Sequence, residues 1–215
     1  MNILTEDIEF SNTKLTLTNQ RVIYWETKET LILSDIHIGK TAHFRQHGIA
    51  VADTILHEDL ERLSTLITHF SPKRIIVVGD LFHANYNSNI EIFKDWLISI
   101  SHIDKVLIKG NHDKMSEKKI QKLGFETVSF LRENGLTFRH DLDDAVEGES
   151  IICGHMHPGV RIKFKGNQYI KLPCYLVSKH QLILPAFSLF TGLNTKFNQE
   201  ENKAYAFDEQ LIFRV

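Results

Sequence analysis

Residues 31–39 read Leu-Ile-Leu-Ser-Asp-Ile-His-Ile-Gly, an apolar run that ends in a carboxylate and an imidazole two positions apart. Two further apolar runs, residues 75–78 and 106–108, also end in polar clusters. Short and nearly continuous apolar runs are typical of strands that are buried on both faces of a sheet. Residues 53–70 and 89–101 lie between these runs and have the apolar spacing of amphipathic helices. The first half of the chain is therefore predicted to alternate strands and helices.

The segments on either side of this alternation are predicted to be mostly strand. The pattern of residues 7–25 favours a hairpin whose strands are residues 14–18 and 21–25. Beyond residue 122 the same criteria predict six more strands, at residues 128–131, 136–139, 150–153, 168–172, 181–184 and 211–215. No linker, repeat or low-complexity tract interrupts the chain, so residues 1–215 are predicted to form a single domain.

Composition narrows the class of protein. The 215 residues are 42% hydrophobic and 24% charged, which is enough apolar material for a sizeable core. A net charge of -2 lacks the global basic footprint of a strong nucleic-acid binder, although it leaves local patches open. No apolar run approaches the roughly 18 residues of a membrane span and no signal segment is apparent, so we expect a cytoplasmic protein. Cys153 and Cys174 are predicted to be buried thiols, and the 12 histidines suggest metal or proton-transfer chemistry.

Polar clusters at the carboxyl ends of strands form the ligand sites of open α/β sheets. Asp35 and His37 can point to the same side of an extended chain and face one ion. Taken alone, each cluster also fits ordinary turn or packing chemistry. The four clusters follow one another as Asp35-Ile36-His37, Gly79-Asp80, Gly110-Asn111-His112-Asp113 and Gly154-His155-Met156-His157.

In this order, the four motifs resemble the calcineurin-like metallophosphoesterase superfamily. The resemblance implies a four-layer α/β/β/α sandwich of two mixed sheets flanked by helices, with two divalent metal ions at the strand ends. His112 would be the general acid, and His140 would be the family's isolated histidine at the end of the strand at residues 136–139. The implied ligands are Asp35, His37 and His157 for one ion, Asn111, His140 and His155 for the other, and Asp80 as the bridge between them.

This ligand set suits phosphoryl transfer on general grounds. Two divalent ions bring +4 and two carboxylates return -2, which leaves about +2 to match a hydroxide and a phosphodiester. His112 follows the ligand Asn111 and could protonate the departing oxygen, with Asp113 as a possible orienting group. Nitrogen and oxygen ligands without thiolate favour manganese, iron or zinc over a soft-metal site and do not select among them. Manganese is the ion we expect, with iron, zinc or nickel as alternatives.

The segment Gly79-Asp80-Leu81-Phe82-His83-Ala84 distinguishes branches of the superfamily. Phosphatases that resemble calcineurin carry Gly-Asp-x-x-Asp-Arg, whose arginine binds a phosphomonoester, and His83 and Ala84 replace that pair here. Gly-Asp-Leu-Phe-His is instead similar to the SbcD-type DNA repair nucleases, in which the histidine faces the substrate phosphate. This resemblance implies a catalytic role for His83, with a supporting role behind the ligands as the alternative.

A resemblance over nearly the whole chain is to the bacterial DNA-ligase-associated metallophosphoesterases of PdeM type. The matching segments are residues 33–40, 44–48, 172–174 and 184–192. That group is described as DNA damage-response endonucleases encoded near a DNA ligase and a helicase. The resemblance implies a phosphodiester hydrolase that acts on DNA in repair, in functional association with a ligase and a helicase. The sequence does not indicate the oligomeric state.

Three residues are candidate substrate contacts: Arg45, Lys114 and Arg161. Lys114 begins a lysine-rich segment that continues to Lys122, and Arg161 alternates with Lys163 and Lys165 in a predicted strand. Such patches could neutralise backbone phosphates, although a solvated helix face and a strand edge are the commoner explanation, and a structural ion pair explains Arg45 equally well. The remaining histidines lack ligand spacing and are predicted to be surface or packing residues: His43, His47, His57, His69, His102 and His180.

Two alternative functions stay open. The first is hydrolysis of a small nucleotide or a phosphomonoester. The second is a scaffold of the same fold that binds proteins without turnover, which predicts gaps in the ligand set, and the sequence has none.

Overall fold

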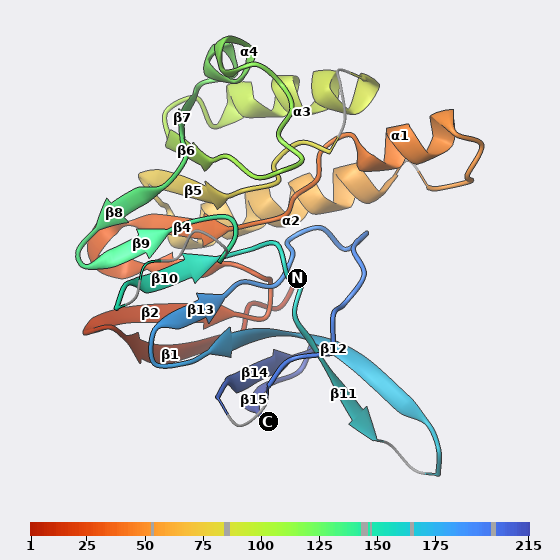
Figure 1. Ribbon diagram of the computed structural model, residues 1–215. Helices are drawn as coiled ribbons and strands as arrows, with labels where there is room; N and C mark the ends of the chain where they lie inside the picture. Colours follow the sequence, from red (N-terminus) through yellow and green to blue (C-terminus); the bar gives the residue numbers. More distant parts are fainter. Residues whose placement is uncertain (53, 84–86, 143–145, 147, 164–165, 199–200) are drawn as a thin grey trace.

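The computed structural model describes residues 1–52, 54–83, 87–142, 146, 148–163, 166–198 and 201–215. Two mixed β-sheets pack face to face, and helices lie along the outside of the first sheet (Figure 1). This arrangement confirms the expected α/β sandwich of two mixed sheets. None of the helices in the described ranges is long and apolar enough to cross a membrane.

The first sheet supplies the alternating strands predicted from the sequence. Its strands β4, β5, β6 and β7 are parallel neighbours, whereas β1 to β4 pair antiparallel. The order across the sheet is β1 (Thr5–Phe10), β2 (Thr13–Thr18), β3 (Ile23–Trp25), β4 (Thr30–Leu33), β5 (Arg74–Val78), β6 (Asp104–Ile108) and β7 (Phe125–Val128).

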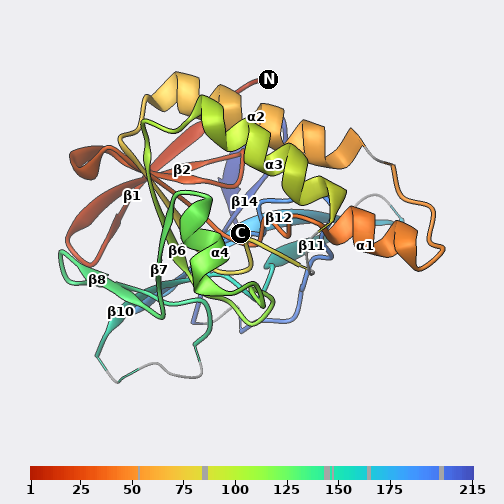
Figure 2. The ribbon, with the colours of Figure 1, turned by 90° about the horizontal axis from the view of Figure 1, so that it is seen from above.

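The helices occur between the strands of this sheet. The two longest, α2 and α3, run side by side over its outer face, and α1 extends beyond its edge (Figure 2). Apolar side chains of α2 at helical spacing, including Leu56, Leu60 and Leu63, face the sheet. The bounds are α1 (Lys40–Gln46), α2 (Thr54–Phe70), α3 (Ser88–Ser99) and α4 (Glu117–Lys122), with a 3-10 turn η1 (Glu26–Lys28).

The second sheet is formed almost entirely by the second half of the chain. Strands β9 and β13 both pair parallel with β10, and the remaining pairs are antiparallel. The order is β15 (Ile212–Arg214), β14 (Lys203–Phe207), β12 (Tyr169–Val177), β13 (Gln181–Ile183), β10 (Ser150–Cys153), β9 (Leu136–Phe138) and β8 (Leu131–Glu133), with β11 (Gly159–Lys163) paired to β12.

Three apolar layers hold the elements together. Along β5, Ile75 and Val77 face the helices, whereas Ile76 and Val78 face the second sheet, because side chains alternate along a strand. A third cluster covers the outer face of the second sheet, where Val160 of β11 packs with buried residues of the sheet. Both cysteines are buried and unbonded, as predicted. The sheets are therefore fixed from both sides, and their strand ends are held in place.

The structure also corrects several boundaries. Residues 128–131 were predicted as one strand, but β7 ends at Val128 and β8 begins at Leu131. The end of one strand and the start of the next lie so close in sequence that together they had the pattern of a single strand. The hairpin predicted within residues 7–25 is the inner pair of strands, β2 and β3, of a four-stranded antiparallel meander that begins at Thr5 and ends with β4. Two elements, α1 and β14, gave no clear pattern and were not predicted, whereas β11 and α4 lie where the sequence suggested a basic strand and a lysine-rich helix face.

Candidate metal centre

The candidate site lies where the carboxyl ends of strands from both sheets meet. In the first sheet, Asp35 follows β4, Asp80 follows β5 and Asn111 follows β6. In the second sheet, His140 follows β9 and His155 follows β10, which is its parallel neighbour. Parallel strands present their carboxyl ends at one edge, so these side chains converge. The structure thus brings together the seven residues that were predicted as ligands.

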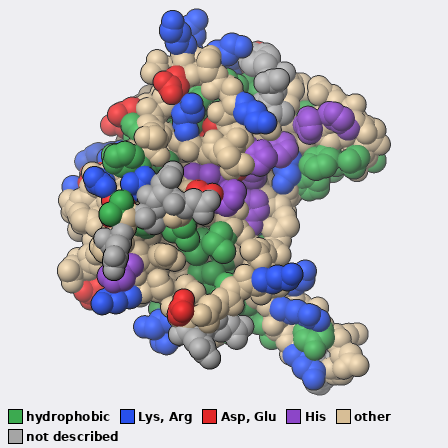
Figure 3. Space-filling model, viewed as in Figure 1, with side chains coloured by type: hydrophobic (Ala, Val, Ile, Leu, Met, Phe, Trp, Pro, Cys, Tyr) green, Lys and Arg blue, Asp and Glu red, His purple; other side chains and the backbone are tan. Residues whose placement is uncertain are grey.

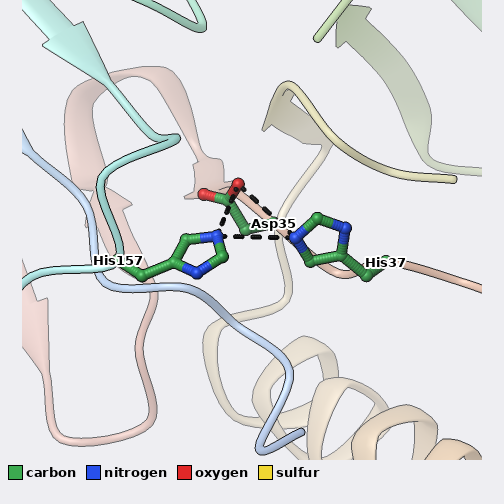
Figure 4. A group of neighbouring side chains, drawn as sticks. All are labelled: Asp35, His37 and His157. Carbon is green, nitrogen blue, oxygen red and sulfur yellow. Dashed lines mark hydrogen bonds and ion pairs between the residues drawn. The ribbon is translucent and has the colours of Figure 1, made fainter. Parts of the chain in front are cut away.

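The first group consists of Asp35, His37 and His157, whose polar atoms point toward one another (Figure 4). The Nε2 atoms of the two histidines are 3.4 Å apart. Asp35 Oδ1 lies 3.1 Å from His157 Nε2 and 3.9 Å from His37 Nε2. A transition-metal ion takes such nitrogen and oxygen ligands at about 2.0 to 2.2 Å, so three atoms this close together could hold one ion.

The second group is adjacent and more open to solvent. His140 Nε2 lies 3.4 Å from Asp80 Oδ2, 3.1 Å from Asn111 Oδ1 and 3.2 Å from His155 Nδ1. Asp80 and His140 are buried, whereas Asn111 and His155 are exposed. Together with the first group, this gives two places for a cation. In each group two of the three residues that could hold the ion are buried and the third is more accessible to solvent.

Backbone strain is concentrated at these residues. Non-glycine residues rarely adopt φ between +20° and +160°, and such strain persists only where the surrounding structure enforces it. It allows side chains from short loops to turn toward a common centre. Five of the seven predicted ligands have this conformation: Asp35 (φ 55°), His37 (53°), Asp80 (51°), His155 (66°) and His157 (47°).

Two glycines permit the close approach of the loops. A Cβ at Gly79, which has φ +82°, would lie 1.9 Å from Nδ1 of His140. A Cβ at Gly154 would lie 2.6 Å from the Ser34 hydroxyl and 2.7 Å from Asp35 Oδ2. Any side chain at either position would displace a predicted ligand, so the Gly-Asp and Gly-His motifs need glycine for steric reasons.

The donor set of the first group fits a divalent metal ion. Ser34 Oγ and His155 N donate to Asp35 Oδ2 at 2.6 and 3.0 Å, whereas the buried Oδ1 accepts no hydrogen bond from the described residues. A buried carboxylate oxygen without a donor is costly unless a cation satisfies it. Burial lowers the pKa of His37 to about 3, so its imidazole is neutral and can ligate.

Asp80 and His140 form the corresponding pair in the second group. Burial opposes the charged form of each, but their mutual hydrogen bond and attraction outweigh it, so the pKa of Asp80 falls to about 2 and that of His140 rises to about 9. His140 Nδ1 lies 3.1 Å from the carbonyl oxygen of Val78, which orients Nε2 toward Asp80. The carboxylate is thus ionised and ready to share with a cation.

His112 and His83 lie beside the first group. Their rings stack with centroids 4.9 Å apart, and each is also close to His37, at 5.5 and 5.3 Å. His112 N donates to Asp80 Oδ1 at 2.9 Å, which fixes the position of the His112 backbone. Burial lowers the pKa of His83 to about 4. Asp113 was expected to orient His112, but its carboxylate accepts hydrogen bonds from the backbone of Gly110 and Phe82.

The three predicted substrate contacts are more scattered. Arg45 in α1 donates to the carbonyl oxygens of Val51 and Ala52 at 3.4 Å, in the segment that follows the helix. Lys114 is exposed and precedes α4. Arg161 is exposed on β11, a strand that begins two residues after His157. Two positions discussed above, Ala84 and Lys165, lie outside the described residues.

Sequence reasoning missed a buried network that supports Asp35. Asp59 and Arg62 of α2 form an ion pair at 3.1 Å, and Arg62 lies over the ring of Phe187 at 4.1 Å. Asp59 also accepts a hydrogen bond from Leu189 N. Phe187 N in turn donates to Ser34 O at 2.8 Å. This network explains the motif at residues 184–192, because it anchors that segment beside the loop that carries Asp35.

Asp59→Asn should lower the free energy of unfolding by about 3 kcal/mol, because it leaves the buried guanidinium of Arg62 without its counter-charge. Urea denaturation of the two proteins measures the difference. Glu58→Gln is the matched control, since it makes the same carboxylate-to-amide change at the neighbouring exposed position and should be neutral within about 0.5 kcal/mol. Equal stability of both variants would contradict the structural role of the pair.

A sequence model of the calcineurin-like phosphoesterase family matches residues 29–186, which include every predicted ligand. The chain belongs to the calcineurin-like phosphoesterase family. It is accordingly a metal-dependent phosphoesterase, a hydrolase of a family that uses divalent metal ions.

Solved structures extend the likeness to the whole chain. The crystal structure of the nuclease MPE from Pseudomonas putida is similar with a TM-score of 0.81 and 24% identity, over 99% of this chain and 100% of that chain. Yfce, a phosphoesterase from E. coli, aligns with a TM-score of 0.45 and 17% identity, over 86% of this chain and 97% of that chain. Comparison with curated protein sequences gives no match. The P. putida structure supports the fold from end to end.

Proposed function

We propose that residues 1–215 form one catalytic domain, a dinuclear phosphodiesterase that cleaves DNA. The observation that carries this proposal is the pair of adjacent ligand groups at one sheet edge, with His112 and His83 beside them. The groups are tied to each other, since His37 N donates to Asp80 O at 2.9 Å and His155 N donates to Asp35 Oδ2. Asp80 is the proposed bridge between the two ions.

Each side chain has a defined task in this proposal. Two bound divalent ions would activate a water molecule and neutralise charge on the phosphoryl oxygens. His112 donates the proton that the leaving oxygen needs, and His83 donates a hydrogen bond to the substrate phosphate. Ser34 holds Asp35 so that Oδ1 stays available. All seven ligands offer nitrogen or oxygen and none offers thiolate, which suits manganese, iron or zinc; manganese is the proposed metal.

The choice of DNA rests on resemblance. The P. putida neighbour is described as a nuclease, and the motif at residues 79–83 resembles the SbcD-type nucleases. The wider resemblance to the PdeM-type group supports an endonuclease in DNA repair. A cytoplasmic location and functional association with a DNA ligase and a helicase belong to the same proposal. Arg45 and Lys114 are retained as proposed substrate contacts.

With manganese, the enzyme should have a higher kcat/KM for bis-(p-nitrophenyl) phosphate than for p-nitrophenyl phosphate. A monoester carries an additional negative charge near neutral pH, and the sequence has Ala84 where the phosphomonoester-specific branch has the arginine that would bind it in a bidentate manner. His83→Ala should reduce diester hydrolysis by about 10²-fold, since it removes one donor to the transition state. Steady-state kinetics measure the substrate preference and the loss of rate, and elemental analysis checks that the variant still binds both metal ions.

His47→Ala serves as the control, because His47 is an exposed histidine that directly follows α1. It should retain the kcat/KM of the parent enzyme. Equal or better efficiency on the monoester, together with no cleavage of single-stranded or duplex DNA across a manganese titration, would favour the small-molecule phosphatase instead.

A further inference from the structure

The strands β11 and β12 project from the body of the molecule as a two-stranded ribbon (Figure 1). Within the described chain, residues 169–173 of β12 pair with β11 alone, and β12 joins the second sheet from Cys174 onward. The ribbon starts directly after the His155-Met156-His157 loop. Asn194 N donates to His157 O and Gly159 N donates to Asn194 O, both at 2.9 Å, which fixes the base of the ribbon relative to the metal centre.

One face of the ribbon is basic and aromatic. Arg161 pairs with Lys171, and Lys163 pairs with Tyr169, in the antiparallel register. Directly opposed residues share a face, as do residues two apart along one strand, so all four side chains lie on the same face. All four are exposed, and the Arg161 guanidinium lies 3.8 Å from the centre of the Tyr169 ring. The opposite face is apolar and carries Ile162 toward the outer core cluster.

The charge segregation is stronger than ordinary surface patterning. Residues 150–199 contain six lysines and arginines but no aspartate or glutamate, although the whole chain has a net charge of -2. Surfaces whose only role is solubility mix positively and negatively charged side chains. Cations that only protect a strand edge need not share one face. The ribbon therefore has the features of a surface that binds a polyanion.

The ribbon also borders the catalytic hollow. In the space-filling view, histidines gather in a recess between two projections, one over α1 and the other over the ribbon, and lysine and arginine side chains cover the ribbon (Figure 3). Lys163 lies six residues beyond His157. At about 3.3 Å per strand residue, the basic face reaches about 20 Å from the ligand.

We propose that the basic face of the β11–β12 ribbon binds a single strand of nucleic acid and guides it into the metal centre. Combined cations and an exposed aromatic ring are the usual means of binding single strands, where phosphates pair with the charges and a base stacks on the ring. A single strand can bend into a recess whose ligands Asp35 and Asp80 are buried, whereas a duplex is stiff over about 150 base pairs. This inference rests on the proposed diesterase function and extends it to the polymer.

The test measures binding of an oligonucleotide of about 20 nucleotides by fluorescence anisotropy in chelator, so that no cleavage is needed. The triple variant Arg161→Gln, Lys163→Gln, Lys171→Gln should bind about 10- to 100-fold more weakly near 0.1 M salt, and its salt slope should be shallower by about 2. The loss should be much smaller for a dinucleotide, which cannot reach the ribbon.

The matched control is Lys14→Gln, Lys73→Gln, Lys94→Gln, which removes the same charge from surface ion pairs elsewhere. It should keep the parent affinity. Tyr169→Ala should weaken binding about tenfold and Tyr169→Phe should restore it, because stacking needs the ring and not the hydroxyl.

Unchanged binding by the basic-face variant, an equal loss in the control variant, or tighter binding of duplex than of single strands by the parent protein would overturn the inference. The proposed function is judged separately, by manganese-dependent hydrolysis of bis-(p-nitrophenyl) phosphate and DNA by the parent protein. If the strand binds to the ribbon but no diester is hydrolysed, the proposed function fails and the ribbon assignment stands.

Discussion

Asp80→Asn should reduce phosphodiester hydrolysis by about 10³-fold or more. Asp80 is buried, its Oδ2 faces His140 Nε2 at 3.4 Å, and its backbone carbonyl accepts from His37 N. The amide has nearly the same shape but removes one of the two negative charges in the proposed ligand set. The variant should therefore fold while losing affinity for at least one ion.

Asp104→Asn is the control for this change. Asp104 begins β6 at the opposite edge of the same sheet and is exposed, so the same carboxylate-to-amide substitution should leave turnover intact. Turnover and bound metal are measured on both variants after manganese loading. Retention of two tightly bound ions and of parent activity by Asp80→Asn would show that Asp80 does not bridge a metal pair.

His112→Ala should lower turnover by about 10² to 10⁴-fold while both ions remain bound. The ring of His112 stacks on His83 and is not within the two ligand groups. A proton donor matters most when the departing oxygen is a poor leaving group. The loss should therefore be larger for DNA, which releases an alkoxide, than for bis-(p-nitrophenyl) phosphate, which releases a stabilised phenolate.

His102→Ala is the matched control, because His102 is exposed at the amino-terminal side of β6 and should tolerate the change. Single-turnover rates on both substrates, with metal content measured in parallel, separate the two possible roles. A loss of metal proportional to the loss of activity, or an equal loss for both leaving groups, would mean that His112 is not the proton donor.

The ligand motifs could be predicted from sequence because their chemistry is local. Asp35 and Asp80 each follow a recognisable apolar strand, and parallel pairing places the ends of such strands together. His140 has no motif of its own and was located by the family resemblance and the end of the strand at residues 136–139. The structure places it in contact with Asn111 and His155.

Interactions between distant segments were not predictable in this way. Asp59 and Arg62 are three residues apart on a helix, a spacing that also occurs on solvated surfaces. Only the tertiary structure shows that they are buried against Phe187 and support the loop that carries Asp35. The basic face of the ribbon is similar, since Lys171 joins Arg161 through strand pairing across the hairpin.

The most direct test of the account is the number of manganese ions bound by the intact protein, measured by elemental analysis alongside hydrolysis of bis-(p-nitrophenyl) phosphate during a metal titration. The two adjacent ligand groups predict about two ions per chain and activity that rises with occupancy of the second. A stoichiometry that stays at one ion or none under saturating manganese, or full diester hydrolysis with a single ion bound, would contradict the dinuclear mechanism.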